Sequence, residues 1–169
     1  MERPELLRSL IIHEPSLLGL LSGDADGSAV LEEVRARLSA VAKLIAEGEN
    51  AKAAETFVDT VAFEPGAWQT SFPEPAKETF ILNAPTFLGE LAEEEAFFID
   101  LQALRLFSKP TFLTEGGQSP PFFKAIIAKL VTALPQAQRH TFQEAGHVPH
   151  LSYPEVFASE LARFAASSR

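Results

Sequence analysis

Residues 139–150 of this 169-residue chain read RHTFQEAGHVPH: a short β-like run, then a loop that carries a histidine. Gly146 permits a sharp turn just before His147, and Pro149 fixes the backbone two residues after it. Imidazole titrates near neutral pH, so a histidine held in such a loop can take and return a proton during catalysis. The same pattern also fits a surface loop with no catalytic task, and the rest of the chain has to decide between the two.

Three segments are predicted to form a small parallel sheet. Ser9–His13 and Pro110–Thr114 are apolar runs bounded by breakers, as buried parallel strands are, and Arg139–Gln143 is the third. Apolar residues at helical spacing predict a helix over residues 120–134 that Pro135 closes, which makes a β-α-β unit of the second and third strands. The fold class is therefore α/β.

The remaining segments are predicted to be helical. Glu5–Arg8 is interpreted as the end of a helix before the first strand, and Pro154–Ala166 as a last helix with one apolar face. Between the first two strands the chain shows helical periodicity and no alternating strand pattern, with prolines as breaks. The helices expected there cover about residues 30–47, 51–61, 74–82 and 86–95. We expect an all-helical insertion over residues 28–106, between two parts of one core, residues 1–27 and 107–169.

Composition excludes several classes of protein. The net charge of −9 argues against a nucleic-acid partner, because phosphate binding needs clustered lysine and arginine. Without cysteine the chain can form neither a disulfide nor a thiolate metal site. No stretch has the length of a membrane span and the first residues have no apolar signal core, so we expect a soluble, cytoplasmic protein with no membrane partner.

Two ionisable residues follow the predicted strands directly. Functional groups of an open parallel sheet collect beyond the carboxyl ends of its strands; there His147 follows the third strand and Glu14 the first. The Glu14 carboxylate is expected within hydrogen-bond reach of the His147 ring, where it would accept the Nδ1 proton and orient the imidazole. A carboxylate that only caps the next turn is the alternative interpretation of Glu14.

These segments, in this order, resemble the second half of the α/β-hydrolase family. Residues 3–15 resemble its sixth strand, residues 109–117 its seventh, and residues 142–150 its eighth strand with the loop that carries the catalytic histidine. The helical insertion is similar to the lid, or cap, that follows the sixth strand. The resemblance implies a partial α/β-hydrolase fold with about three parallel strands, flanking helices and a helical cap. It also implies His147 as the general base of a triad and Glu14 as its acid.

The position of the acid departs from the usual family pattern. Most members carry an aspartate after the seventh strand, whereas this chain reads GGQSP at residues 116–120, with Ser119 at the usual position. Some members, such as haloalkane dehalogenases, carry the acid after the sixth strand, and Glu14 matches that position. Asp24 and Asp26 lie further along the same connection and rank below Glu14 as candidates.

The nucleophile is the larger departure from the family. No Gly-x-Ser-x-Gly motif occurs in the sequence, and the family's oxyanion-hole donors also belong to the part that is not matched. Met1 falls within the helix that should precede the sixth strand, which suggests a truncated gene, a misplaced start or a fragment of a longer protein.

The resemblance implies a serine-type hydrolase of small, fairly hydrophobic esters or similar acyl substrates, to which this chain supplies the acid and the histidine. Trp68, Phe87 and His150 are the expected substrate contacts, and no cofactor or metal is expected. Whether the chain alone is an enzyme stays open, because a non-catalytic remnant or binding module of the same fold is the alternative. A third interpretation is a metal site of His147, His150 and Glu14, against which Pro149 and the absence of a helical pattern after His147 argue.

The first strand also predicts association. In the family's sheet the sixth strand pairs with the seventh and the fifth, and this chain carries no fifth strand, so Ser9–His13 would have one unpaired edge. The strand is apolar on both faces and carries no lysine, proline or bulge that would blunt that edge. We therefore expect self-association, pairing with a separate N-terminal half, or a chain that stays partly molten.

Overall fold

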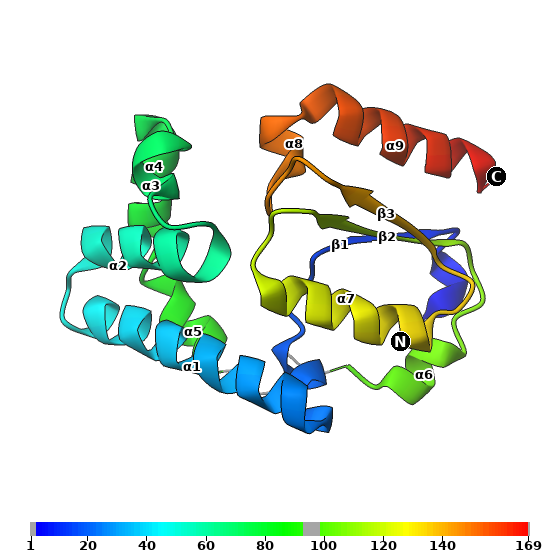
Figure 1. The fold of residues 1–169 in the computed structure, drawn as a ribbon, viewed down its shortest axis with the longest axis horizontal. Helices are drawn as coiled ribbons and strands as arrows, with labels where there is room; N and C mark the ends of the chain where they lie inside the picture. Colours follow the sequence, from blue (N-terminus) through cyan, green and yellow to red (C-terminus); the bar gives the residue numbers. More distant parts are fainter. Residues whose placement is uncertain (1–2, 93–98, 169) are drawn as a thin grey trace. The chain divides into compact units, whose positions relative to one another are not determined.

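The structure, a computed structural model, describes residues 3–92 and 99–168 (Figure 1). It divides into two compact units. The sheet unit consists of Met1–Leu20 and Ile99–Arg169 and contains the described strands, whereas the helical unit is Leu21–Phe98. The strand ends that carry Glu14 and His147 both belong to the sheet unit.

A three-stranded parallel sheet forms the centre of the sheet unit, as predicted. Its strands are β1 (Leu10–His13), β2 (Thr111–Gly116) and β3 (Gln138–Phe142), in the order β1-β2-β3. β2 runs two residues further than the sequence predicts, because its last residues pair with the end of β3, where Gly116 is in register with Phe142. Every residue of β2 is buried, as expected of a central strand with helices on both faces.

Two helices cover the two faces of the sheet (Figure 1). α7 (Pro121–Ala133) packs against β2 on one face, while α9 (Pro154–Ser167) lies over the other, and both were predicted. On the α9 face the ring of Phe164 stacks on Phe112 of β2, with the ring centroids 5.0 Å apart. α7 buries an apolar stripe made of Phe122, Phe123, Ile126, Ile127 and Leu130. Burying each of these side chains contributes about 1.5–3 kcal/mol, so α7 anchors the sheet.

Short helical segments connect these elements. They are the 3₁₀ helices η1 (Pro4–Leu6) and η2 (Leu18–Gly23) and the short α-helices α6 (Leu101–Arg105) and α8 (Pro149–Ser152). The helix end predicted over Glu5–Arg8 is a 3₁₀ turn instead. The segment after His147, predicted to lack a helical pattern, forms α8, because proline fits the first turn of a helix, where its missing N–H is not needed.

The helical unit consists of helices joined by tight turns. They are α1 (Ala25–Ala46), α2 (Asn50–Phe57), η3 (Val58–Ala62), α3 (Ala67–Thr70), α4 (Glu74–Asn83) and α5 (Thr86–Ala92). The apolar stripe predicted for the first helix is buried in α1, at Leu31, Val34, Leu38, Val41 and Ile45. Residues 93–95, which the sequence assigns to the last of these helices, lie outside the described residues.

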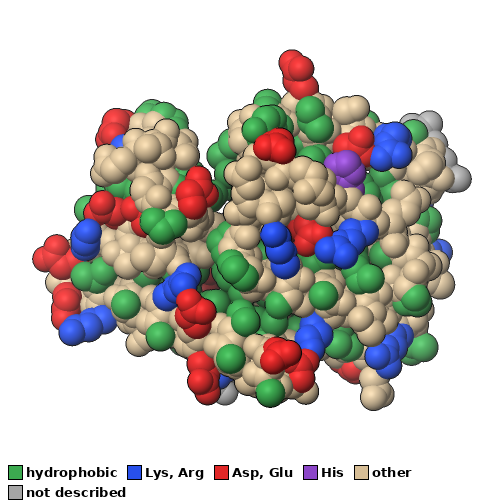
Figure 2. Space-filling view, in the orientation of Figure 1, with side chains coloured by type: hydrophobic (Ala, Val, Ile, Leu, Met, Phe, Trp, Pro, Cys, Tyr) green, Lys and Arg blue, Asp and Glu red, His purple; other side chains and the backbone are tan. Residues whose placement is uncertain are grey.

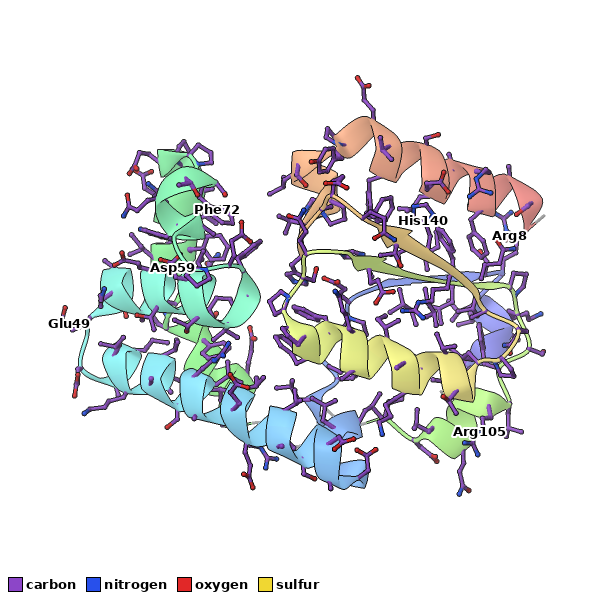
Figure 3. All side chains as sticks on the ribbon, in the orientation of Figure 1. Arg8, Glu49, Asp59, Phe72, Arg105 and His140 are labelled. Atoms are coloured by element: carbon purple, nitrogen blue, oxygen red, sulfur yellow. The ribbon has the colours of Figure 1, made fainter. Side chains whose placement is uncertain are left out.

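The second predicted helix, over residues 51–61, is α-helical only in its first part. α2 continues into η3, which is a π-helical turn, and the chain then breaks at residues 64–66 as predicted. The Asp59 carboxylate in this turn accepts a hydrogen bond from the Trp68 amide at 2.8 Å (Figure 3). This bond joins the two sides of the break and holds the start of α3 in place.

Apolar and aromatic side chains form the core of the helical unit. Its buried cluster consists of Ala54, Val58, Ala67, Trp68 and Phe72. Phe80 lies edge-on to both Trp68 and Phe72, with ring centroids 6.3 and 5.4 Å apart, a geometry that suits the ring quadrupoles. Apolar packing therefore holds this unit together, and these aromatic residues have a structural task.

Charged side chains of both signs are interspersed on the face of the molecule that Figure 2 shows. On that face no broad basic patch is visible among the described residues. None of the helices in the described part of the chain combines the length and the apolar character that a membrane span requires.

Candidate active site

Glu14 and His147 meet beyond the carboxyl ends of the strands. Glu14 directly follows β1, and His147 lies in the loop between β3 and α8. Because the strands are parallel, both loops leave the sheet at the same edge. Glu14 Oε2 lies 2.8 Å from His147 Nδ1, so the contact expected from the sequence is present. The catalytic role of the two side chains stays a prediction.

The Glu14 carboxylate is buried and accepts hydrogen bonds at both oxygens. Its Oε1 accepts from the Gly116 amide at 2.7 Å, and its Oε2 accepts from the Ser119 hydroxyl at 2.8 Å as well as from the His147 ring. Burial by itself would raise the pKa of the Glu14 carboxyl, but these hydrogen bonds outweigh it and lower the pKa below its ordinary value. Glu14 is therefore ionised at neutral pH, as an acid that orients an imidazolium must be.

The backbone of Glu14 is strained. Its φ is +35°, and Glu14 is the only non-glycine residue with a positive φ in the described part of the chain. A residue with a β-carbon is disfavoured there, and the following Pro15 restricts its backbone further. Strain of this kind persists where surrounding contacts enforce it, and it is common at active sites. Glu14 is held by its amide, which donates to the Thr114 carbonyl at 3.3 Å, and by the Gly116 and Ser119 hydrogen bonds to its carboxylate.

Two glycines let the loop after β2 lie against the histidine loop. A β-carbon at Gly116 would overlap the carbonyl oxygens of Ala145 and Gly146. The Gly117 amide donates to the Phe142 carbonyl at 2.9 Å, which ties the two loops together. The sequence shows the Gly-Gly pair, but it does not show that the pair lies against the histidine loop.

Neighbouring rings restrict the imidazole of His147. Phe123 of α7 lies nearly parallel to it, with centroids 4.2 Å apart and planes inclined by 13°. The ring of His13 is also nearly parallel to it, at 6.0 Å. About a quarter of the His147 side chain stays accessible to solvent. Packing of this kind limits ring rotation, so Nδ1 remains directed at Glu14.

His13 is a second histidine at the site, and sequence reasoning missed it because it is also the last residue of a predicted strand. Its Nε2 lies 3.0 Å from the His147 carbonyl oxygen, and its Nδ1 lies 2.9 Å from the Thr114 hydroxyl. A carbonyl can only accept, so Nε2 carries the proton and Nδ1 accepts from Thr114. Burial lowers the pKa of His13, which favours this neutral form. His13 thus fixes the backbone of the loop that carries His147.

A metal ion would have to compete with these hydrogen bonds. His13, Glu14 and His147 each offer one ligand atom within 4.8 Å of the others, a set that differs from the His147–His150 site considered from the sequence. Glu14 Oε2 and His147 Nδ1 are bonded to each other, and His13 Nε2 is bonded to a carbonyl. Coordination would break these bonds, so the arrangement fits an acid–histidine pair better than a metal site.

The other predicted site residues have different surroundings. His150 lies exposed on α8, with its ring centroid 5.9 Å from that of Phe157. Trp68 is buried in the core of the helical unit, and Phe87 is half-buried there. The second-ranked acid, Asp24, is the N-cap of α1 and accepts from the Gly27 amide at 2.9 Å. Asp26 is exposed in the first turn of the same helix.

Nearly the whole length of this chain is similar to part of the structure of MenH from S. aureus. The match has a TM-score of 0.67 and covers 96 % of this chain at 15 % sequence identity. It takes in 60 % of the MenH chain, so this chain spans about three fifths of that protein's length. No protein-family model and no curated protein matches the sequence. The resemblance predicted from the sequence is confirmed at the level of the fold: the chain has a partial α/β-hydrolase fold.

Proposed function

We propose that this chain supplies the acid and the general base of a serine-type α/β-hydrolase, Glu14 and His147, to a nucleophile that its own sequence does not contain. The observation that carries the proposal is the 2.8 Å contact between Glu14 Oε2 and His147 Nδ1 beyond the carboxyl ends of a parallel sheet. The partial α/β-hydrolase fold supports it, because functional groups of such sheets collect at that edge.

In the proposed reaction His147 first accepts a proton as general base and then donates it as general acid. Because Nδ1 donates its proton to the ionised Glu14, the lone pair of the ring is on Nε2. Nε2 takes the proton of the nucleophilic hydroxyl as that oxygen attacks the ester carbonyl, and then gives it to the leaving alcohol. The negative charge of Glu14 stabilises the imidazolium that exists between the two steps.

Ser119 is not the proposed nucleophile. It is 5 % exposed, and its hydroxyl donates to Glu14 Oε2. A serine nucleophile needs its hydroxyl directed at the base that activates it. In this proposal the nucleophile and the oxyanion-hole amides come from a Gly-x-Ser-x-Gly turn on another segment of the fold.

The proposed substrate is a small, fairly hydrophobic ester or similar acyl compound, with the helical unit as its lid. Phe87, a half-buried aromatic residue of that unit, supports an apolar substrate. Of the predicted contacts, Phe87 and His150 keep accessible surface, whereas Trp68 is 7 % exposed and packs in the core. Phe87 and His150 are therefore the better candidates for direct contact, and Trp68 would shape the lid from inside.

Ester hydrolysis tests the proposal in two steps. Alone, the chain should hydrolyse a chromogenic ester no faster than its His147→Ala variant, because His147 has no hydroxyl to activate. Mixed with a separately expressed segment that carries the first five strands and a Gly-x-Ser-x-Gly turn, the chain should restore turnover. In that mixture His147→Ala should reduce kcat by at least about 10³-fold.

His140 offers a matched control for the loss of a histidine. It belongs to β3, and its Nδ1 lies 3.8 Å from Glu160 of α9 (Figure 3), so His140→Gln should leave turnover unchanged. Turnover by the isolated chain that depends on His147 would show that the chain holds its own nucleophile. Turnover by the mixture that does not depend on His147 would remove the proposed role of the pair.

A further inference from the structure

The loop between β2 and α7 reaches back to the acid through Ser119. The hydroxyl of this buried serine donates to Glu14 Oε2 at 2.8 Å, a contact between residues 105 positions apart. The Ser119 amide is fixed as well, since it donates to the Gly116 carbonyl at 3.3 Å. Pro120 and Pro121 follow at the start of α7 and leave the backbone beside the serine little freedom.

The bond from Ser119 gives the carboxylate a hold that does not depend on the imidazole that it orients. The Gly116 amide holds Oε1, while Oε2 is shared by the Ser119 hydroxyl and the His147 ring. The terminal torsion of a glutamate is soft, and without Ser119 only the imidazole, which itself has to be oriented, would hold Oε2. A hydroxyl on the second oxygen opposes rotation about that torsion, and it favours the ionised form of the acid.

A hydroxyl suits this position for a second reason. It adds a hydrogen-bond donor to the buried carboxylate without adding a positive charge. An arginine or lysine there would repel the imidazolium that forms on His147 during the proposed reaction. The buried acid is thus held by a neutral donor and stays available to stabilise a transient cation.

We propose that Ser119 is a positioning residue for the acid of the triad. It occupies the place after β2 where the family resemblance puts the acid itself, and from there it holds the carboxylate that arrives from β1. The proposal rests on the proposed function of Glu14 and His147. Ser119 acts through Glu14 and takes no part in the proton transfer.

Two variants of nearly equal shape separate the hydroxyl from the volume of the side chain. Ser119→Thr keeps the hydroxyl, and Ser119→Val replaces it with a methyl group. The His147 Nδ1 proton donated to a carboxylate gives a low-field proton NMR resonance. We expect Ser119→Thr to retain that resonance and Ser119→Val to lose it through faster exchange with water. The Glu14 pKa, followed by the ¹³C resonance of its carboxyl, should rise in Ser119→Val and not in Ser119→Thr.

Ser119→Ala adds no atoms to the buried site, and it tests the hydroxyl even if the two larger variants do not fold. It should behave like Ser119→Val. A resonance and a Glu14 pKa that are the same in Ser119→Ala and in the wild-type chain would overturn the positioning role. Failure of the proposed function would look different: the resonance would be absent from the wild-type chain or would persist in Glu14→Gln. The Glu14 pKa would still decide the role of Ser119 in that case.

Discussion

The loops around Glu14 and the sheet face around Glu115 each bury a glutamate, but they satisfy its charge in opposite ways. Glu14 is 2 % exposed and accepts from an amide, a hydroxyl and an imidazole. Glu115 of β2 is 1 % exposed, and its Oε1 accepts from Arg139 Nε at 2.8 Å and from the Thr141 hydroxyl at 2.9 Å. Its Oε2 has no hydrogen-bond partner among the described residues.

Under the proposed function, the difference separates a structural carboxylate, Glu115, from a catalytic one, Glu14. A guanidinium is always charged, so Glu115 has a permanent counter-ion, and the pair ties β2 to β3. Glu14 is held in its ionised form mainly by the hydrogen bond from the His147 ring, and then by those from the Ser119 hydroxyl and the Gly116 amide, none of which is a permanent cation. A carboxylate that stabilises a transient imidazolium needs a partner of this second kind. Backbone strain follows the same division, since it occurs at Glu14 and not at Glu115.

The Glu14 region depends on the close approach of two loops at Gly116. A side chain that prevents this approach should have the largest effect on the free energy of unfolding. Gly116→Ala should lower the free energy of unfolding by about 3 kcal/mol or more, because the added β-carbon would overlap two backbone carbonyl oxygens. Urea unfolding followed by circular dichroism measures the change.

Gly89→Ala is the control for that substitution. Gly89 lies within α5, an added β-carbon there meets nothing within 4 Å, and alanine should stabilise the helix by about 0.5–1 kcal/mol. A Gly116→Ala chain as stable as the wild type would mean that the two loops do not touch in solution.

Replacing each glutamate with glutamine tests whether the two carboxylates have different tasks. Glu115→Gln should lower the free energy of unfolding by about 1–3 kcal/mol, less than a fully buried pair would, because water reaches the half-exposed Arg139. It should leave the low-field His147 resonance unchanged. Glu14→Gln should abolish that resonance, because the neutral amide lacks the negative charge that holds the Nδ1 proton. An equal response of the resonance in both variants would remove the distinction.

Lowering the pH should lower the free energy of unfolding through two groups of the Glu14 region, His13 and Glu14, because folding lowers the pKa of both. Burial lowers the pKa of His13, so below its ordinary pKa of about 6.5 the unfolded chain binds a proton that the folded chain does not. Stability should fall as the pH drops through that range. The lowered pKa of Glu14 adds a second loss below its ordinary value of about 4.3.

His13→Gln separates these two losses, since its amide can still donate to the His147 carbonyl but does not titrate. Its urea midpoint should change less between pH 7 and pH 5 than the wild-type midpoint does. The stability difference between His13→Gln and the wild-type chain at pH 5 should be smaller than the loss caused by Gly116→Ala or Glu115→Gln. Identical pH profiles would show that His13 is protonated as easily in the folded chain as in the unfolded one.

Helices and strands with a regular apolar pattern could be predicted from the sequence. β1 and β2 are apolar runs, and the buried positions of α1 and α7 recur every three or four residues, so local patterns identify them. Glu14 and His147 could be placed together because parallel strands bring their carboxyl ends to one edge. The proline-rich breaks between helices were equally visible.

Other contacts between distant residues could not be predicted. Ser119 reaches Glu14 across 105 positions and His13 reaches the His147 backbone across 134, and no periodic pattern records either contact. Glu115 escaped notice because a glutamate at the end of a strand is expected to face water, and its burial depends on a partner in the next strand. Spacing alone also cannot distinguish the π-helical turn of η3 from a regular helix.

The two glutamates also differ in the strands that carry or precede them. β2, which contains Glu115, is paired on both sides, whereas β1, which leads into Glu14, pairs with β2 alone among the described strands. A free apolar edge is a template for another chain. We propose that the edge of β1 is covered in solution by a second copy of this chain or by a separate N-terminal half of the fold.

Ile11 allows a test of that proposal with little change in stability. It lies within β1 and is 37 % exposed, so Ile11→Lys should alter the free energy of unfolding by less than about 0.5 kcal/mol. It should nevertheless shift the chain towards the monomer in sedimentation velocity at micromolar concentration, because a charge on an edge strand opposes pairing. Leu106→Lys, at an 83 % exposed position outside the sheet, should leave assembly unchanged. A wild-type chain that is already a stable monomer would mean that the edge beside Glu14 needs no partner, and that the acid–histidine pair is held by the three-stranded sheet alone.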